Sequence, residues 1–135
     1  MGLDNGITLY TKHEINFNKE PYYISKFVNI YRDNVYEYDV CYWRKCWDVR
    51  ERIINILNVG QEGGVYEIDT PEQVVAIREA LIDFLRQPEE WRDSIWEIHD
   101  LLDTLGQQII NLTWLADYMT KHRNEYLVVE FYDSY

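Results

Sequence analysis

Apolar residues recur at alternating spacings of four and three between positions 91 and 119. The members of this series are Trp91, Ile95, Ile98, Leu102, Leu105, Ile109, Leu112, Ala116 and Met119. Such spacing places all of them on one side of an α-helix, as in a heptad repeat. The series continues across Gly106, so it predicts one long helix over roughly 89–121. The alternative is a helical hairpin broken at Gly106, because glycine weakens a helix interior.

The side of this helix that faces away from the series changes character along its length. In the first half it is acidic and carries Glu89, Glu90, Asp93, Glu97, Asp100 and Asp103. In the second half it carries Ile110, Trp114 and Tyr118. We therefore expect the first half to keep one solvated face and the second half to be buried on two sides.

Two further helices are predicted upstream. Over about 42–58, apolar residues that include Trp43, Trp47 and Ile53 gather on one face when the chain turns by about 100° per residue. The second helix, 71–86, follows the start signal Thr70-Pro71-Glu72-Gln73. In that signal Thr70 and Gln73 can form a capping box, and proline suits the first helical turn.

Strands are predicted near both ends of the chain. Apolar and polar residues alternate from Ile7 to Tyr10, within a strand-rich region over about 5–40, and again over 125–132. Residues 65–68 read as a short strand or an extended link. The sequence thus predicts an α+β fold in a single domain, 1–135. An antiparallel sheet of N-terminal strands plus the C-terminal strand packs against three helices, including one long helix, mainly on one face.

The net charge of −11 lies wholly in the second part of the chain. Residues 1–59 hold eight acidic and eight basic residues, whereas residues 60–135 hold sixteen acidic and five basic ones. This balance favours solubility and argues against direct nucleic-acid binding. The sequence has no apolar run of about 18 residues and no secretory signal, so we expect a cytoplasmic protein and no membrane partner.

Sequence motifs of known catalytic centres are absent. The chain has no nucleotide-binding loop, no dinucleotide fingerprint and no zinc-protease or hydrolase signature. Its two cysteines, Cys41 and Cys46, cannot build a disulfide framework or a zinc site by themselves. We therefore expect no cofactor and no metal, and we lean towards a protein that is not an enzyme.

Arg50 is the first candidate for a binding residue. On a helical wheel it falls inside the apolar face of helix 42–58, between residues such as Cys46 and Ile53. A buried guanidinium needs a carboxylate, backbone carbonyls or an anionic ligand, since an unpaired buried charge is costly. Arg50 is therefore a ligand-binding residue, one half of a structural ion pair, or an arginine whose charged end reaches the solvent at the edge of the apolar face.

Trp43, Arg44 and Lys45 could assist Arg50 in holding an anionic group. Interleaved aromatic and basic residues can stack on a nucleotide and neutralise its charge. A core stripe with solvated charges beside it explains the same pattern.

The acidic residues in the first half of helix 89–121 form a second candidate site. A face of this kind could imitate nucleic acid and occupy a host protein that binds nucleic acid. An ordinary solvated helix surface has the same composition.

Three short features give the chain a resemblance. They are the opening Met1-Gly2-Leu3-Asp4, the motif Tyr42-Trp43-Arg44-Lys45 at a predicted helix start, and the aromatic-rich residues 126–135. In these the chain resembles a group of small phage and prophage proteins of uncharacterised function. Those proteins commonly have Ala-Asn where this sequence has Cys46-Trp47. The resemblance implies a phage or mobile-element origin and a place in the host cytoplasm, and it implies no activity.

Three functions follow from these features. The leading hypothesis is a phage or mobile-element accessory protein that acts by binding a macromolecular partner, such as a host protein, through its acidic helical face. One alternative is an enzyme or small-ligand binder that holds an anionic group through Arg50. The other is a structural protein that self-associates through the heptad series and its aromatic ends.

Overall fold

A computed structural model describes residues 4–17, 21, 24–29, 35–44, 46–86 and 98–134. The elements follow one another as β1 (Asp4–Thr11), β2 (Ser25–Asn29), β3 (Val35–Arg44), α1 (Trp47–Leu57), β4 (Gly64–Glu67), α2 (Pro71–Arg86), α3 (Ile98–Lys121) and β5 (Leu127–Ser134). The α+β class is confirmed, and the C-terminal strand β5 lies in the sheet as predicted.

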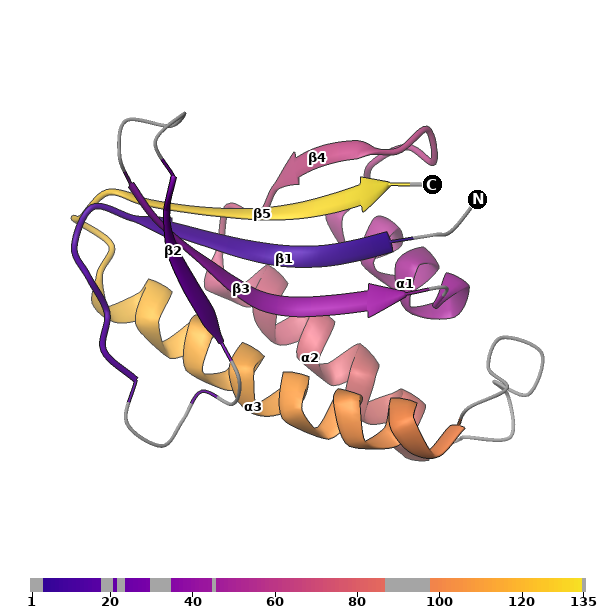
Figure 1. Ribbon diagram of the computed structural model, residues 1–135. Coiled ribbons are helices and arrows are strands. Elements are labelled where there is room, and N and C mark those ends of the chain that lie inside the picture. Colours follow the sequence, from indigo (N-terminus) through magenta and orange to yellow (C-terminus); the bar gives the residue numbers. More distant parts are fainter. Residues whose placement is uncertain are drawn as a thin grey trace.

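The five strands form one antiparallel sheet in the order β2-β3-β1-β5-β4 (Figure 1). β1 lies at its centre, between β3 and β5, and pairs with both over its whole length. The central strand pair is therefore built from segments at opposite ends of the sequence.

Strand register divides the side chains between two faces of the sheet, because residues directly opposite one another point the same way. The row that contains Ile7 and Phe131 and the row that contains Leu9, Tyr38 and Val129 point into the core, and all five residues are fully buried or nearly so. The alternate rows, which begin at Asp4, Gly6, Thr8 and Tyr10 of β1, point to the opposite side. We call the face formed by these alternate rows the outer sheet face.

All three helices lie on the other side of the sheet (Figure 1). α2 and α3 pack side by side, and α1 lies next to α2 at one end of the sheet. Residues such as Ile53, Ile77 and Leu112 fill the space between helices and sheet in one apolar cluster. In the described part of the chain, no helix is long and apolar enough to cross a membrane.

α3 runs without a break across Gly106, so the hairpin alternative is wrong for residues 98–121. The predicted residues 89–97 lie outside the described part of the chain. Leu105, Leu112, Ala116 and Met119 of the heptad series are buried in the protein's own core. On the second side of the helix, which was expected to be buried, Trp114 is half-buried and its ring lies 5.1 Å from that of Phe17, whereas Ile110 is 36% exposed.

The prediction is wrong for residues 42–44 and for Cys46. They were expected to begin a helix, but Tyr42, Trp43 and Arg44 belong to β3, and α1 begins at Trp47. Pairing with β1 explains the difference, because it extends to Asp4 opposite Arg44. Trp47 was placed on the core face, yet it is 47% exposed at the first position of α1.

The start of α2 agrees with the prediction. The Gln73 amide donates to the Thr70 hydroxyl at 3.2 Å, and the Thr70 amide donates to Gln73 Oε1 at 3.1 Å. These reciprocal bonds are those of a capping box, and the helix spans Pro71–Arg86 as expected.

Candidate functional site

Arg50 lies at a buried junction between α1 and the two central strands. Its Nε donates to Asp133 Oδ1 at 2.8 Å, and its Nη2 donates to the carbonyl of Gln61 at 2.8 Å. Asn5 Nδ2 donates to the same carboxylate oxygen at 2.6 Å. The Arg50 side chain is 2% exposed and that of Asp133 is 0% exposed. We call Asn5, Arg50 and Asp133 the buried polar junction.

This junction holds the guanidinium against a carboxylate of the protein itself. An anionic ligand would need to displace Asp133, and that would leave a second charge buried without its partner. Arg50 also lines neither of the two cavities described below. The arrangement is that of a structural ion pair that joins α1, β1 and β5.

The other residues predicted to assist Arg50 are not brought to it. Trp43 is 2% exposed and packs in the core, whereas Arg44 is exposed on the outer sheet face. Successive residues of a strand point to opposite faces, so the strand geometry of β3 separates them. Lys45 lies outside the described residues.

Most of the predicted acidic face also lies outside the described residues. This holds for Glu89, Glu90, Asp93 and Glu97 and for the side chain of Asp100. Asp103 is exposed at the start of the described part of that face, where its Oδ2 accepts a hydrogen bond from Gln107 Nε2 at 3.1 Å.

A cavity of about 300 Å³ lies where α3 crosses the edge of β3. Its lining residues come from three elements and are Ser25, Asp39, Val40, Cys41, Tyr42, Gln107, Gln108 and Asn111. We call it the β3-edge cavity. Two of the lining amides bond α3 to β3: Gln108 Nε2 donates to the Tyr42 carbonyl at 2.7 Å, and Asn111 Nδ2 donates to the Val40 carbonyl at 3.0 Å.

Three ionisable groups of the β3-edge cavity have shifted pKa values. The hydrogen bond to Asp4 raises the pKa of the Tyr42 phenol above its ordinary value. Partial burial, with the nearby charge of Glu37, raises the pKa of the Asp39 carboxyl above its ordinary value. Complete burial raises the pKa of the Cys41 thiol well above its ordinary value. Because the thiolate is the reactive form of cysteine, Cys41 is unsuited to nucleophilic chemistry.

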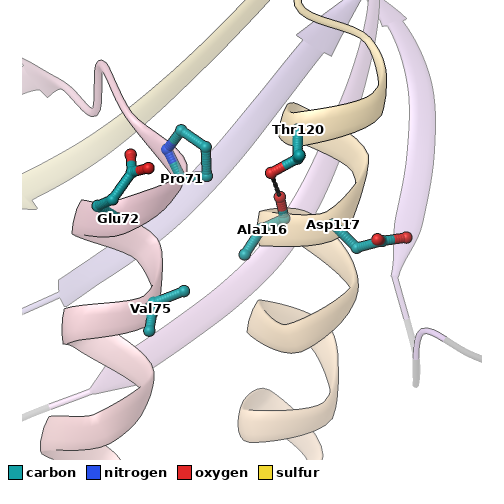
Figure 2. Close-up of a pocket in the computed structure, with 6 residues that line it drawn as sticks. All are labelled: Pro71, Glu72, Val75, Ala116, Asp117 and Thr120. Atoms are coloured by element: carbon teal, nitrogen blue, oxygen red, sulfur yellow. Dashed lines mark hydrogen bonds between the residues drawn. The ribbon is translucent and has the colours of Figure 1, made fainter.

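A second, shallower hollow of about 350 Å³ lies between the start of α2 and the end of α3 (Figure 2). Glu72 contributes an exposed carboxylate from α2, whereas the polar groups from α3 are already engaged within that helix. The Thr120 hydroxyl donates to the Ala116 carbonyl at 2.9 Å. Asp117 Oδ2 forms a salt bridge with Lys121 Nζ at 2.9 Å. Val75 supplies an exposed apolar wall. This hollow therefore offers a ligand one apolar wall and one exposed carboxylate.

The outer sheet face carries aromatic and acidic side chains. Its carboxylates are Asp4, Glu37, Asp39, Glu67 and Glu130, and its described basic residue is Arg44. Three tyrosines, Tyr10, Tyr42 and Tyr132, lie among them. No helix covers this face in the described part of the chain (Figure 1).

Tyr132 and Tyr42 form the centre of this face. Tyr132 lies over Gly6 of the neighbouring strand, where any Cβ atom would overlap its ring. Burial against the sheet, together with acidic neighbours such as Asp39, raises the pKa of Tyr132 to about 12. The Tyr42 hydroxyl donates to Asp4 Oδ1 at 2.7 Å. The tyrosines therefore form an ordered surface.

The sequence predictions missed Asp39, Gln108 and Asn111. A signal for the two amides was present, because positions 108 and 111 put polar residues beside Leu105 and Leu112 of the apolar series. A buried amide on such a helix needs a partner, and here the carbonyls of β3 provide it.

Comparisons with protein-family models, with curated proteins and with solved structures found no match to this chain. Among the described residues, no group of three or more histidine, cysteine, aspartate or glutamate side chains could hold a metal ion.

Proposed function

We propose that this protein acts by binding a macromolecular partner, and that the outer sheet face receives a basic segment of a protein partner. The observation that carries the proposal is the composition of that face. Five carboxylates stand against a single arginine, around three tyrosines that no helix covers in the described part of the chain.

Charge supports a basic partner in particular. Two pairs of these carboxylates are closely spaced: Glu67 and Glu130 lie opposite each other on adjacent strands, about 5 Å apart, and Glu37 and Asp39 lie about 7 Å apart along β3. Both spacings are within the screening length of about 8 Å at physiological ionic strength, so their fields add. Such a face attracts lysine and arginine side chains and repels nucleic acid.

The tyrosines support a protein partner. A tyrosine presents a large apolar ring and a hydroxyl group at once, and it is enriched in protein interfaces for this reason. Tyr42 is 49% exposed, and Val65 in the same row is 61% exposed, so the row offers apolar contact area. A basic peptide could pack its side-chain stems on this row while its charges meet the carboxylates.

This proposal refines the hypothesis of an accessory protein of phage or mobile-element origin. A phage origin would make a host protein a natural partner. The structure favours neither alternative function. Arg50 forms an ion pair with Asp133, and the residues of the heptad series from Leu105 onwards pack inside the protein.

The test uses a short peptide of alternating lysine and serine, with a glutamate–serine peptide as the charge control. Binding is measured by fluorescence anisotropy and mapped by amide chemical shifts in NMR. We expect the lysine peptide to shift outer-face residues of β1, β3 and β5 and the glutamate peptide to have no effect. Affinity should fall as salt is added.

A matched pair of variants distinguishes binding at the outer sheet face from a general effect of the protein's net charge. Glu67→Lys/Glu130→Lys changes two outer-face carboxylates, and Glu72→Lys/Glu79→Lys makes the same charge change on exposed positions of α2. The first variant should weaken binding about tenfold, as removal of close charge complementarity does, and the second should have a much smaller effect. Equal weakening by both variants, or no binding of the lysine peptide, would refute the proposed surface.

A further inference from the structure

The β3-edge cavity exists because β2 is shorter than its neighbour. β2 pairs with β3 only from Val35 to Asp39, whereas β3 continues to Arg44. Along this continuation α3 replaces a strand partner, since its amides bind the carbonyls of Val40 and Tyr42. The cavity lies at the step where β2 ends and α3 takes over.

The groups left for a ligand in this cavity are mainly hydrogen-bond acceptors. The side-chain nitrogens of Gln108 and Asn111 are already used on β3. Gln108 Oε1 is buried and has no hydrogen-bond partner among the described residues, and Gln108 as a whole is 5% exposed. A buried acceptor without a donor costs free energy, so a ligand that supplies a donor gains from it.

The charge of the cavity lining also favours a ligand that carries hydrogen-bond donors. Asp39 is the carboxylate among its lining residues, and no described lysine, arginine or histidine lines it. Ser25 adds a hydroxyl that can accept as well as donate. A complementary ligand therefore carries a positive charge and several N–H donors.

The position of the cavity connects it to the outer sheet face. Asp39 and Tyr42 belong to the outer-face rows and also line the cavity. A volume of about 300 Å³ is at the lower end of the range for ligand pockets and suits one side chain better than a larger molecule.

We propose that the β3-edge cavity is a pocket for one arginine side chain of the basic partner, with the guanidinium bonded to Asp39 and Gln108 Oε1. This inference rests on the proposed function, because it assigns the partner's anchor residue. A planar guanidinium has five donors in a fixed fork and can serve a carboxylate and an amide oxygen together. A lysine ammonium is a compact, strongly hydrated charge, and it fits two separate acceptors such as a carboxylate and an amide oxygen less well.

The test uses three small probes: the blocked single amino acids N-acetyl-arginine methylamide, its citrulline counterpart and its lysine counterpart. Citrulline has nearly the shape of arginine but no charge, so it isolates the contribution of the guanidinium. Binding is followed by NMR, through the side-chain amide signals of Gln107, Gln108 and Asn111. The arginine probe should shift these signals, and the citrulline and lysine probes should bind at least about tenfold more weakly.

Asp39→Asn and Glu37→Gln form the matched pair of variants. Both remove one outer-face charge from β3, but only Asp39 lines the cavity. We expect Asp39→Asn to weaken the binding of the arginine probe about tenfold, in line with the loss of a charged hydrogen bond. Glu37→Gln should change the affinity for this probe little. Equal effects of the two variants, equal binding of citrulline or lysine, or shifts that avoid the three amides would overturn the proposal.

The two proposals fail in different ways. Suppose that the lysine–serine peptide binds and loses affinity in Glu67→Lys/Glu130→Lys, while the arginine probe does not reach the cavity. The proposal that the outer sheet face binds a basic segment is then supported, and the proposal of an arginine pocket is wrong. If the arginine probe binds the cavity but the peptide does not bind the protein, the pocket exists without the proposed docking surface.

Discussion

Arg50 Nε and Asp133 Oδ1 lie 2.8 Å apart in the interior, although 83 residues separate them in the sequence. Asn5 donates to the same carboxylate oxygen, so α1, β1 and β5 meet at one oxygen atom. A buried pair of this kind is costly to form, and it is far more costly to break from one side.

The first prediction concerns this pair. Arg50→Met should lower the free energy of unfolding by about 3–5 kcal/mol, because it leaves the Asp133 carboxylate buried without its cation. Urea unfolding followed by circular dichroism measures the change. Arg44→Met, at an exposed position of β3, is the control and should stay within about 0.5 kcal/mol. A loss below about 1 kcal/mol for Arg50→Met would contradict a structural role for the pair.

A second prediction tests the contact between α3 and the open edge of β3. Asn111→Leu removes the donor to the Val40 carbonyl, and the free energy of unfolding should fall by about 1–3 kcal/mol, the cost of a buried group left unsatisfied. Gln107→Leu is the matched control in the same helix, because Gln107 is less buried and its amide donates to the exposed side chain of Asp103. If the two variants lost equal stability, the amides would not be acting as a substitute strand.

Gly106 offers a prediction of the opposite sign. It lies inside α3, and a Cβ atom added there would meet nothing within 4 Å. Gly106→Ala should therefore raise the free energy of unfolding by about 0.5–1 kcal/mol, because alanine loses less backbone entropy in a helix. Thermal or urea unfolding measures the gain. A destabilised Gly106→Ala protein would mean that α3 does not run straight through this position.

The fourth prediction concerns alkaline stability. The pKa of Tyr132 is raised to about 12 in the folded protein, above the ordinary value of 10.0. The folded state therefore favours the neutral phenol. Its contribution to stability is complete below about pH 10 and is lost as the pH rises through about 12. Tyr132→Phe cannot ionise at this position, so its stability should decline less steeply between those pH values.

Urea unfolding at a series of alkaline pH values checks this prediction. Tyr126→Phe, which removes an exposed tyrosine hydroxyl, is the control and should follow the parent protein. Parallel curves for the parent and for Tyr132→Phe would show that the Tyr132 phenol is not shielded over Gly6.

Local patterns predicted those parts of the fold that depend on local interactions. The capping box at Thr70 and Gln73 is a contact between residues three apart, and it predicted the start of α2 correctly. The alternation of Leu127, Val129 and Phe131 predicted β5 because one face of that strand is buried. The apolar series through Gly106 predicted a continuous α3, since packing against α2 and the sheet outweighs the glycine penalty.

The sequence predictions are wrong where a segment distant in the sequence determines the local structure. Trp43 and Trp47 are four apart and fit one helical face equally well, but pairing with β1 draws Trp43 into β3. The burial of Arg50 was foreseen from its place among apolar residues. Its partner Asp133 was not, because nothing local links the two. The β3-edge cavity was missed for the same reason, since it needs the relative lengths of β2 and β3 and the position of α3.

The central place of β1 in the sheet bears on how the protein folds as it is made. β1 leaves the ribosome before the other described strands, yet one of its two edges can be completed only when β5, the last of the described elements, emerges. Pairings between such distant segments form slowly, and an unpaired strand edge can attract other chains in the meantime. β1 should therefore associate with β3 while synthesis continues, and its free edge should depend on chaperones until β5 arrives.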